Sequence, residues 1–371
     1  MDLNNIKFIE TDTDSIKQHI ITVYEGLTGR TLALADPVRL FLCSLASIIG
    51  EQRNLIDYLT RQNMLAFAEG VFLDIIGMLV GTARLQASAA VTTVRFTLSA
   101  PQPSAVIIPK GTRVTPDGAL MFATTEVAQI APGQLTTDVV VACQQAGELG
   151  NGYLPGELSR LVDPLPFLPT VANTTTTNGG ADTEADDDYR ERIEDAPGQF
   201  SVAGPDDAYI YHAKSAHASI GDVSVDSPPG NEGKVFIYVL LKTGKPASRE
   251  ILDAVNAVCN DKRIRPLTDR VFVKAPTVVP YNVRGAFYID AANASRATAI
   301  QADVAKALED YVAWQHGALG RDINPSELIH RIIQAGAKRV EITEPAFTQL
   351  LASQVAGEQE VNLSLGGLED A

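Results

Sequence analysis

The 371-residue chain is poor in cysteine and in basic residues, and each shortage excludes a class of protein. Its three cysteines, Cys43, Cys143 and Cys259, lie far apart in the sequence. This spacing fits neither a disulfide framework nor a zinc site, and it suits a reducing compartment. With 30 Lys and Arg against 45 Asp and Glu, the formal net charge is −15. Nucleic-acid binding needs clustered basic residues, so the sequence argues against a nucleic-acid partner.

Long apolar runs, aromatic residues and catalytic motifs are also scarce. The most apolar stretches, residues 40–50 and 71–81, are shorter than the ~20 residues that cross a bilayer. The N-terminal segment is polar and lacks a signal-peptide pattern, so we expect synthesis in a cytoplasm and no membrane insertion. Aromatic residues make up only 6% of the chain, with one tryptophan, Trp314, whereas sugar-binding surfaces need stacking rings. No phosphate-binding loop, serine-hydrolase elbow or HExxH motif occurs, so we expect no cofactor and no enzymatic activity.

Apolar residues at three- and four-residue steps predict helices between residues 12 and 80. Asp36 followed by Pro37 predicts a helix start, and Gly70 predicts a helix stop. Residues 1–85 are therefore expected to form a helical N-terminal region, and its apolar stripe is a candidate for a bundle between subunits. The interface candidates on this stripe are Leu42, Leu45, Ile49, Ile56 and Leu59.

From Val91 the apolar period changes to two, as in a half-buried strand, with Val94, Phe96 and Leu98 alternating with polar residues. Short β-rich segments follow, separated by Pro and Gly turns. Residues 86–181 are therefore predicted to form an antiparallel barrel or sandwich.

Mixed helical and strand patterns in the remaining chain predict two small α+β modules, residues 182–275 and 276–345, each a sheet covered by helices on one face. Residues 346–371 are expected to be a tail or an edge strand. The predicted fold class is α+β and multidomain: a helical N-terminal region, a β-barrel or sandwich domain, then the two modules.

The run from Asp182 to Asp188 is dense in carboxylates and is followed at once by arginines. A calcium-type loop needs acids at alternate positions and then a glycine, and no glycine follows here. His212 and His217 are five residues apart, a spacing that does not place both on one helix face, so no metal site is expected there either. A metal-dependent hydrolase built on Asp186, Asp187 and Asp188 is the less favoured alternative.

The start of a helix accounts for the acidic run more fully. Asp182 or Thr183 would cap it, and acids in the first turn would interact favourably with the helix dipole by ~0.3–1 kcal/mol each. Tyr189 and Ile193 would share one face toward a core. Acid–arginine pairs at four-residue spacing would add ~0.2–0.5 kcal/mol each, and these are Asp186–Arg190 and Asp188–Arg192.

Several further segments follow one another in a fixed order: IPKGTRV, FATTE, GELGNG, GGADTEADDDYRERI with FSVAGPDDAY, DVSVDSPPGNEGKVFIYVLL and RPLTDRVFVKAP. This ordered set resembles the baseplate J-like proteins of contractile-tailed phages and phage-tail-like particles. Residues 36–84 also resemble the opening segment of that family. The signature at the helix start comprises Gly179, Gly180, Asp182, Asp186, Arg190 and Arg192.

The resemblance implies a structural component of the baseplate wedge in a virion tail, made in the cytoplasm of a host bacterium and without catalytic residues. The implied partners are a second copy of the chain, a tail protein I-like wedge partner, the baseplate hub or spike, and sheath-initiating proteins. Wedges of this kind are expected to form a six-fold ring around the hub that rearranges on tail contraction. A receptor- or carbohydrate-binding tail module is the alternative that the β-rich middle suggests.

Overall fold

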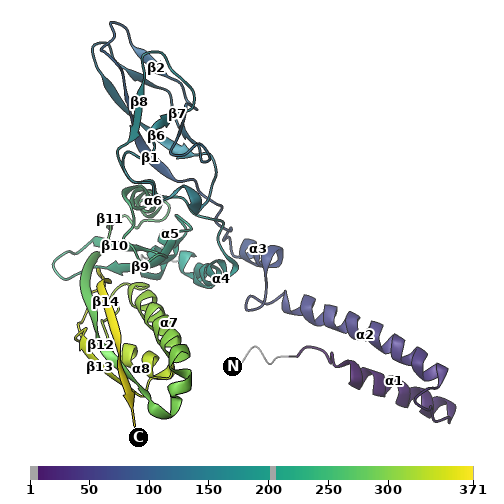
Figure 1. Cartoon of the computed structure of the whole chain (residues 1–371). Coiled ribbons are helices and arrows are strands. Elements are labelled where there is room, and N and C mark those ends of the chain that lie inside the picture. The colour runs from purple at the N-terminus through teal and green to yellow at the C-terminus, as the bar shows by residue number, and fades with distance from the viewer. Residues whose placement is uncertain (1–6, 201–205, 371) are drawn as a thin grey trace. The chain divides into compact units, whose positions relative to one another are not determined.

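The structure is a computed structural model that describes residues 7–200 and 206–370. The chain forms two compact units, Met1–Arg84 with Ala185–Glu194, and Leu85–Glu184 with Asp195–Ala371. Figure 1 labels the helices and strands of both. Residues 201–205, which belong to the FSVAGPDDAY segment of the family resemblance, lie outside the described residues.

The first unit is helical and contains α1 (Thr13–Thr28), α2 (Pro37–Arg61), α3 (Gly70–Leu79) and most of α4 (Asp186–Asp195). The predicted start of α2 is confirmed, because the Asp36 side chain accepts a hydrogen bond from the Val38 amide and Pro37 follows it. The predicted stop at Gly70 is wrong. The helix ends at Arg61, where the buried Gln62 turns the chain by accepting from the Glu69 amide at 2.9 Å, and Gly70 opens α3.

The second unit begins with eight short strands. They are β1 (Val91–Thr97), β2 (Val106–Ile108), β3 (Arg113–Thr115), β4 (Phe122–Thr124), β5 (Ala128–Ile130), β6 (Thr136–Cys143), β7 (Arg160–Leu161) and β8 (Thr170–Asn173). Six of them form an antiparallel sheet in the order β7-β3-β4-β6-β1-β8, and β2 pairs with β5. A short 3-10 turn, η2 (Glu148–Gly150), lies between β6 and β7.

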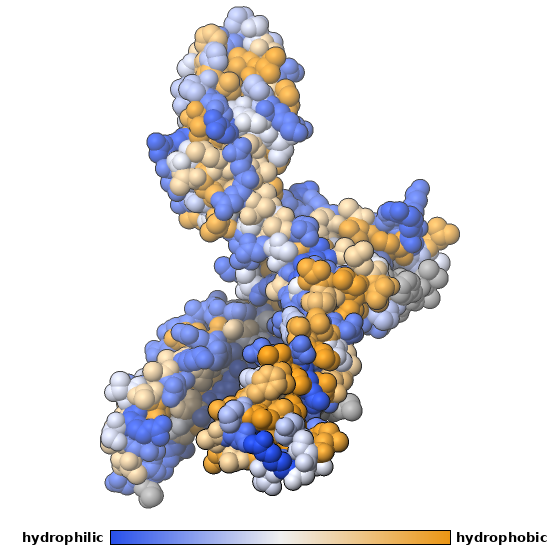
Figure 2. Space-filling model, turned by 90° about the vertical axis from the view of Figure 1, so that its right-hand side faces the viewer, coloured by the Kyte–Doolittle hydropathy of each residue, from blue (hydrophilic) through white to orange (hydrophobic). Residues whose placement is uncertain are grey.

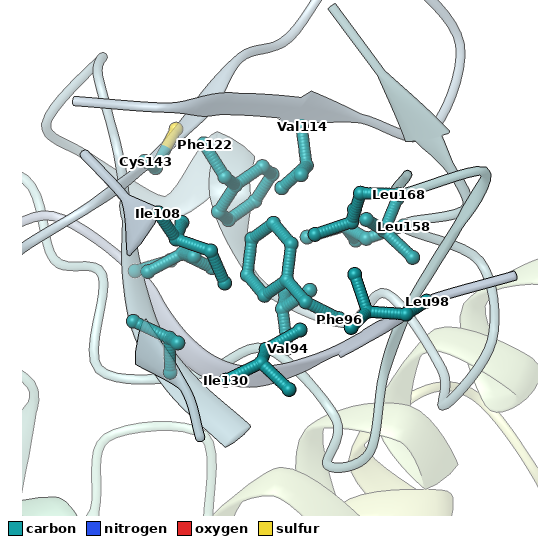
Figure 3. Close-up of a cluster of buried hydrophobic side chains, with 14 residues drawn as sticks. Val94, Phe96, Leu98, Ile108, Val114, Phe122, Ile130, Cys143, Leu158 and Leu168 are labelled. Carbon is teal, nitrogen blue, oxygen red and sulfur yellow. The ribbon is translucent and has the colours of Figure 1, made fainter. Parts of the chain in front are cut away.

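These strands enclose one apolar core, so the open choice between barrel and sandwich is resolved in favour of a barrel-like sheet. Phe96 of β1 and Phe122 of β4 point into its centre, surrounded by aliphatic side chains from the other strands (Figure 3). Val94, Phe96 and Leu98 are all buried, as the two-residue period predicted. Alternation along β1 therefore directs every second side chain inward.

The next part of this unit is a three-stranded sheet with helices packed on it. It contains η3 (Ala196–Phe200), α5 (Asp206–Lys214), β9 (Ile220–Asp226), β10 (Lys234–Leu241), α6 (Arg249–Cys259) and β11 (Arg270–Lys274). The strand order is β11-β10-β9, with β9 antiparallel and β11 parallel to β10. Tyr209 of α5 and Val255 of α6 share a buried core with Ile237 of β10, so these helices cover one sheet face.

The last part repeats this arrangement. It contains β12 (Thr277–Asp290), η4 (Ala291–Arg296), α7 (Ala297–His316), α8 (Pro325–Gln334), β13 (Arg339–Glu344) and β14 (Gln354–Glu369), with strand order β13-β12-β14. Tyr311 of α7 and Leu328 of α8 are fully buried against Val283 of β12. The end of the chain, left open between a tail and an edge strand, forms the edge strand β14. The α+β multidomain class is confirmed, while the boundaries of the five expected domains stay predictions.

A histidine ties the segment after β8 to the loop before β9. The Ser219 amide donates to His217 Nδ1 at 3.2 Å, so Nε2 carries the ring proton and donates to the Gly179 carbonyl at 3.1 Å. Ser88 Oγ donates to the same carbonyl at 2.9 Å. Burial lowers the pKa of His217, because a charged ring would lose its hydration at this site, and this effect outweighs the bond to the Gly179 carbonyl, which favours the charged form.

This geometry predicts a pH-dependent effect of His217. Its pKa is lower in the folded chain than the value of about 6.5 in the unfolded chain, so its stabilising bonds are fully present above about pH 6.5 and weaken below it. The unfolding free-energy difference between wild type and His217→Gln should therefore shrink as the pH falls from about 7.5 to about 5.5. Urea unfolding followed by circular dichroism measures this difference.

The matched control is His19→Gln, because His19 is exposed on α1. The His217→Gln difference should depend on pH more strongly than the His19→Gln difference. Equal dependence of the two differences on pH would contradict the assigned role of the His217 ring.

Candidate functional site

The hairpin of α1 and α2 buries only one face of α2. The buried residues of α2 are Ala46 and Gly50, and both are small, so α1 lies close. A Cβ atom on Gly50 would lie 2.9 Å from Thr13 Oγ1. Between Thr13 and Arg61 the fully buried apolar side chains are Ile16, Ile21, Leu32 and Ala46. The hairpin alone therefore removes little apolar surface from water.

The opposite face of α2 is apolar and exposed, and Figure 2 shows hydrophobic side chains in orange gathered on the side of the molecule that faces the viewer. We define the α2 stripe by its exposed members: Phe41 (61%), Leu45 (37%), Ile48 (53%), Leu55 (56%), Ile56 (50%) and Leu59 (42%). Its three- and four-residue steps are those of a heptad seam, in which Gln52 takes the one polar position.

The five interface candidates from the sequence divide between two environments. Leu45, Ile56 and Leu59 are exposed members of the α2 stripe. Leu42 and Ile49 are half-buried, and Ile49 lines a shallow groove with residues of α1. Whether these side chains contact another chain stays a prediction.

The acidic run continues into α4, which holds the backbone on both sides of α3. Three side chains of α4 that follow the acids donate hydrogen bonds, and the acceptors are main-chain carbonyls of the residues before and after α3. The bonds are Arg190 Nε to Leu65 O (2.9 Å), Arg190 Nη2 to Ala68 O (2.9 Å), Tyr189 Oη to Thr82 O (2.7 Å) and Arg192 Nη2 to Ala83 O (2.6 Å). We call α4 with residues 65–84 the α3 clamp.

An apolar contact supports these bonds. Tyr189 and Ile193 are buried against Ala68 and Leu73, so the prediction that both point to a core is confirmed. Gly77 of α3 is required at this contact, because a Cβ atom there would lie 1.9 Å from Tyr189 Oη. The tyrosine therefore fits only against a helix surface without a side chain at that position.

Asp186 supplies the cap that α3 lacks in its own sequence. Glu69 precedes α3 but makes no capping bond, and Asp186 Oδ2 accepts from the Gly70 amide at 2.9 Å instead. Its Oδ1 pairs with Arg84 Nη2 at 2.7 Å, and Arg84 Nε also pairs with Asp74 of α3 at 2.7 Å. The Gly70 amide first, and then Arg84, hold the pKa of Asp186 below its usual value.

The predicted pair Asp186–Arg190 is wrong. Arg190 uses Nε and Nη2 for carbonyls, and its Nη1 pairs with Asp187 at 2.6 Å, three residues away. Its guanidinium therefore points to the α3 segment while Asp186 faces Gly70 and Arg84. The pair Asp188–Arg192 stays a prediction.

The first half of the signature lies in the second unit and does not start the helix. Asp182 does not cap α4, which begins at Asp186, and its Oδ1 accepts from the Glu148 amide at 3.2 Å. Gly180 exchanges two hydrogen bonds with the Asn151 side-chain amide, at 2.8 and 2.9 Å. A Cβ atom on Gly180 would lie 2.3 Å from the Gly147 carbonyl, so only glycine allows this approach. Gly179 is the residue whose carbonyl receives the His217 bond.

Sequence reasoning missed several parts of this site. Arg84 and Gly77 have no local pattern that marks them as parts of the clamp, because the α4 residues that they contact, Asp186 and Tyr189, lie more than a hundred positions away. The exposed apolar residues of α3 did carry a signal in the apolar run 71–81, which is too short for a membrane span and lies within the predicted helical region. They are Val71 (72%), Phe72 (39%), Ile75 (53%), Met78 (74%) and Leu79 (81%).

Neither a metal centre nor a membrane span is found in the described chain. Across residues 7–200 and 206–370, His, Cys, Asp and Glu side chains nowhere gather in threes able to hold a metal ion. The helices described within these ranges are all too short or too polar to cross a bilayer. What the described residues present is an apolar helical face and a polar clamp beside it.

Three domain models of one protein family match the chain in order. The baseplate J-like barrel domain matches residues 93–180, the baseplate J-like central domain residues 201–275, and the baseplate J-like C-terminal domain residues 282–364. The residues of the α2 stripe and the α3 clamp lie outside these matched ranges. The family assignment therefore depends on the second unit of the chain.

Individual relatives agree with this match. Baseplate protein J of Escherichia phage P2 is 35% identical over 189 residues, which are 50% of this chain and 61% of that protein. Phage-like element PBSX protein XkdT of Bacillus subtilis (strain 168) is 29% identical over 188 residues, 51% of this chain and 49% of that protein. The alignments thus span about half to three fifths of these relatives.

Among solved structures, a chain of the anti-feeding prophage baseplate, determined by cryo-electron microscopy with 6-fold symmetry applied, resembles this chain with a TM-score of 0.44 and 14% identity. The resemblance covers 93% of this chain and 89% of that one.

The α3 clamp predicts that one aspartate of the acidic run matters more than its neighbour. Asp186→Ala removes the α3 cap and one partner of Arg84, so it should destabilise the first unit by ~1 kcal/mol and speed amide exchange in residues 70–79. Hydrogen–deuterium exchange read by mass spectrometry, with urea unfolding beside it, measures both effects.

Asp187→Ala is the matched control. It removes the same charge from the same helix turn, but the Asp187 side chain is 96% exposed and pairs only within α4. Exchange in α3 should stay at the wild-type rate in this variant. Equal effects of the two substitutions would show that Asp186 acts through general charge and not through the cap.

Proposed function

The chain belongs to the baseplate J-like family, and we propose that it is a structural component of the baseplate wedge in a contractile phage tail or phage-tail-like particle. Its relative in phage P2 is itself a baseplate protein. In this proposal the chain has no catalytic activity, and it works by burying surface against neighbouring chains in the baseplate. It would be made in the host cytoplasm and reside in the tail.

The α2 stripe is the observation that carries the proposal. An amphipathic helix normally turns its apolar face toward the core of its own domain. Here α1 covers the side of Ala46 and Gly50, and the wider apolar side faces water. None of the seam positions between Phe41 and Leu59 is charged, in a chain of net charge −15. A contiguous apolar face of this kind marks a protein–protein contact.

The pattern of the stripe indicates what covers it. Apolar residues at heptad spacing pack against other helices with the same spacing, and a single polar residue such as Gln52 at the seam fixes their register. We therefore assign the stripe to a helical bundle. The resemblance to the baseplate J-like family implies that the other members of this bundle are a second copy of the chain and a tail protein I-like partner. The proposed role also includes contacts with the hub or spike and with sheath-initiating proteins. It further includes assembly into a six-fold ring and rearrangement of that ring on contraction.

The stripe predicts which substitutions block assembly. Leu45→Asp with Ile56→Asp should abolish association with the partner chains, because each places a charge in an interface that excludes water. These positions are preferable to Leu42 and Ile49, which are half-buried and whose replacement would also disturb the hairpin. Native mass measurement of the chain co-expressed with its neighbouring gene products follows assembly.

The control places the same two charges on the polar edge of the same helix, as Ser47→Asp with Asn54→Asp, because both residues are exposed. This variant should assemble like wild type, and both variants should keep the circular dichroism of the folded chain. Wild-type assembly by the stripe variant would refute the bundle. A wild-type chain that stays monomeric beside its neighbours would favour the receptor-binding module.

A further inference from the structure

A second surface, far from the α2 stripe in sequence, lies along β14 at the end of the chain. β14 pairs in parallel with β12 on one side, and within the described residues no strand pairs with its other edge (Figure 1). The free edge of a strand presents backbone N–H and C=O groups in a row, and another extended chain can pair with them. Such an edge is an interaction site when the neighbouring surface can hold side chains.

Two bulges limit the regular part of this edge. The register between β12 and β14 shifts at Gln359 and again at Gly366, while residues 360–365 pair without interruption with residues 282–287. Bulges bend a strand and interrupt its ladder. The regular stretch of about six residues is therefore ~20 Å long, and it fits an added strand of similar length.

An apolar groove of about 440 Å³ lies between α7 and β14 at the start of this stretch, where Glu358 and Val361 line it. On the strand side Val361, which is 42% exposed, lines the groove. Leu365, 39% exposed, lies farther along the same sheet face, as does Leu363, which packs on the core. On the helix side the groove is lined by Leu308 and Val312, with small Ala305 and Ala313 beside them. The surface therefore accepts apolar side chains from a strand laid against β14.

The charges around the groove restrict the occupant further. Glu309 and Glu358 line it, and the remaining titratable residue of the lining, His316, already faces Glu358 at 3.3 Å. No lysine or arginine lines it. An occupant with basic ends is therefore favoured over one with acidic ends.

We propose that this groove binds an extended segment of a partner protein, which adds as a fourth strand beside β14. In an extended segment successive side chains point to opposite faces, so alternate apolar residues would enter the groove and a basic residue would flank them. Main-chain hydrogen bonds to residues 360–365 give the affinity, and the groove selects the side chains. This surface acts independently of the α2 stripe.

The test uses the full chain and the fluorescein-labelled peptide KVTVTVK as the probe. Fluorescence anisotropy measures its affinity, and hydrogen–deuterium exchange locates its site. The peptide should slow amide exchange in residues 360–365, and the acidic twin EVTVTVE should bind at least tenfold more weakly. Protection elsewhere with none in β14, or equal affinity for the two peptides, would overturn the proposal.

Two N-methylated peptides test the main-chain bonds. Amides of alternate residues point to opposite edges of a strand, so methylating the valines blocks one edge and methylating the threonines blocks the other. One of the two peptides should lose at least tenfold in affinity. Undiminished binding of both would mean that the peptide binds through its side chains alone, and the added strand would be refuted.

Protein variants complete the test. Val361→Lys puts a charge in the groove and should weaken KVTVTVK at least tenfold, whereas Asn362→Lys makes the same charge change on the opposite face of β14 and should weaken it much less. Equal losses would overturn the proposal. The variant Leu45→Asp with Ile56→Asp should bind the peptide as wild type does, so a failure here is distinct from a failure of the helical bundle.

Discussion

The carboxylate of Asp186 meets a helix N-terminus and a guanidinium at the same time, and the organisation of the first unit depends on this contact. α3 opens at Gly70 without a cap of its own, so its first amides need an acceptor from elsewhere. Asp186 provides one and also fixes Arg84, which reaches back to Asp74. The Asp186 carboxylate thereby connects Gly70 at the start of α3 with Arg84 after its end, and Arg84 in turn contacts Asp74 in the middle of the helix.

The three side-chain donors that follow Asp186 also form hydrogen bonds with the main chain of the α3 segment. Tyr189, Arg190 and Arg192 all donate to carbonyls of residues 65–83, and none of these acceptors depends on the identity of the residue that carries it. The segment around α3 is thus held by its backbone as well as by buried Leu73 and the Asp74–Arg84 pair, and its remaining apolar side chains can face outward. This explains how a helix as apolar as α3 can be fixed in place while Val71 and Leu79 stay exposed.

Local features of the fold could be predicted from the sequence, because their causes lie within a few residues. Asp36 and Pro37 start α2 through a bond across two positions, and Phe96 is buried because its strand alternates. The partners of Asp186 could not be predicted, because a helix start offers several acids to several cations and only packing selects among them. Arg190 turned to carbonyls more than a hundred positions away, which removed it from the expected pair.

The same distinction applies to the candidate site. The sequence placed an apolar stripe on α2, since periodicity alone defines which residues share a helix face. It did not separate Leu45, which faces water, from Ile49, which lies against α1, because both fit the period and only the position of the neighbouring helix distinguishes them. Gly50 could have indicated which side of α2 faces α1, because a glycine on one side of a long amphipathic helix allows a neighbouring helix to approach closely there.

The two exposed surfaces differ in how their chemistry restricts a partner. The α2 stripe has its backbone bonds satisfied within the helix, so only side-chain packing can select what covers it, and a heptad seam accepts any helix of matching spacing. Gln52 is the one polar position that narrows this choice. The edge of β14 instead offers backbone groups that any extended chain can use, and there the acids Glu309 and Glu358 and the small residues of α7 supply the selection. In the proposed role, in which the chain joins several different chains, this division is an advantage, because a partner suited to one surface lacks the backbone geometry required by the other.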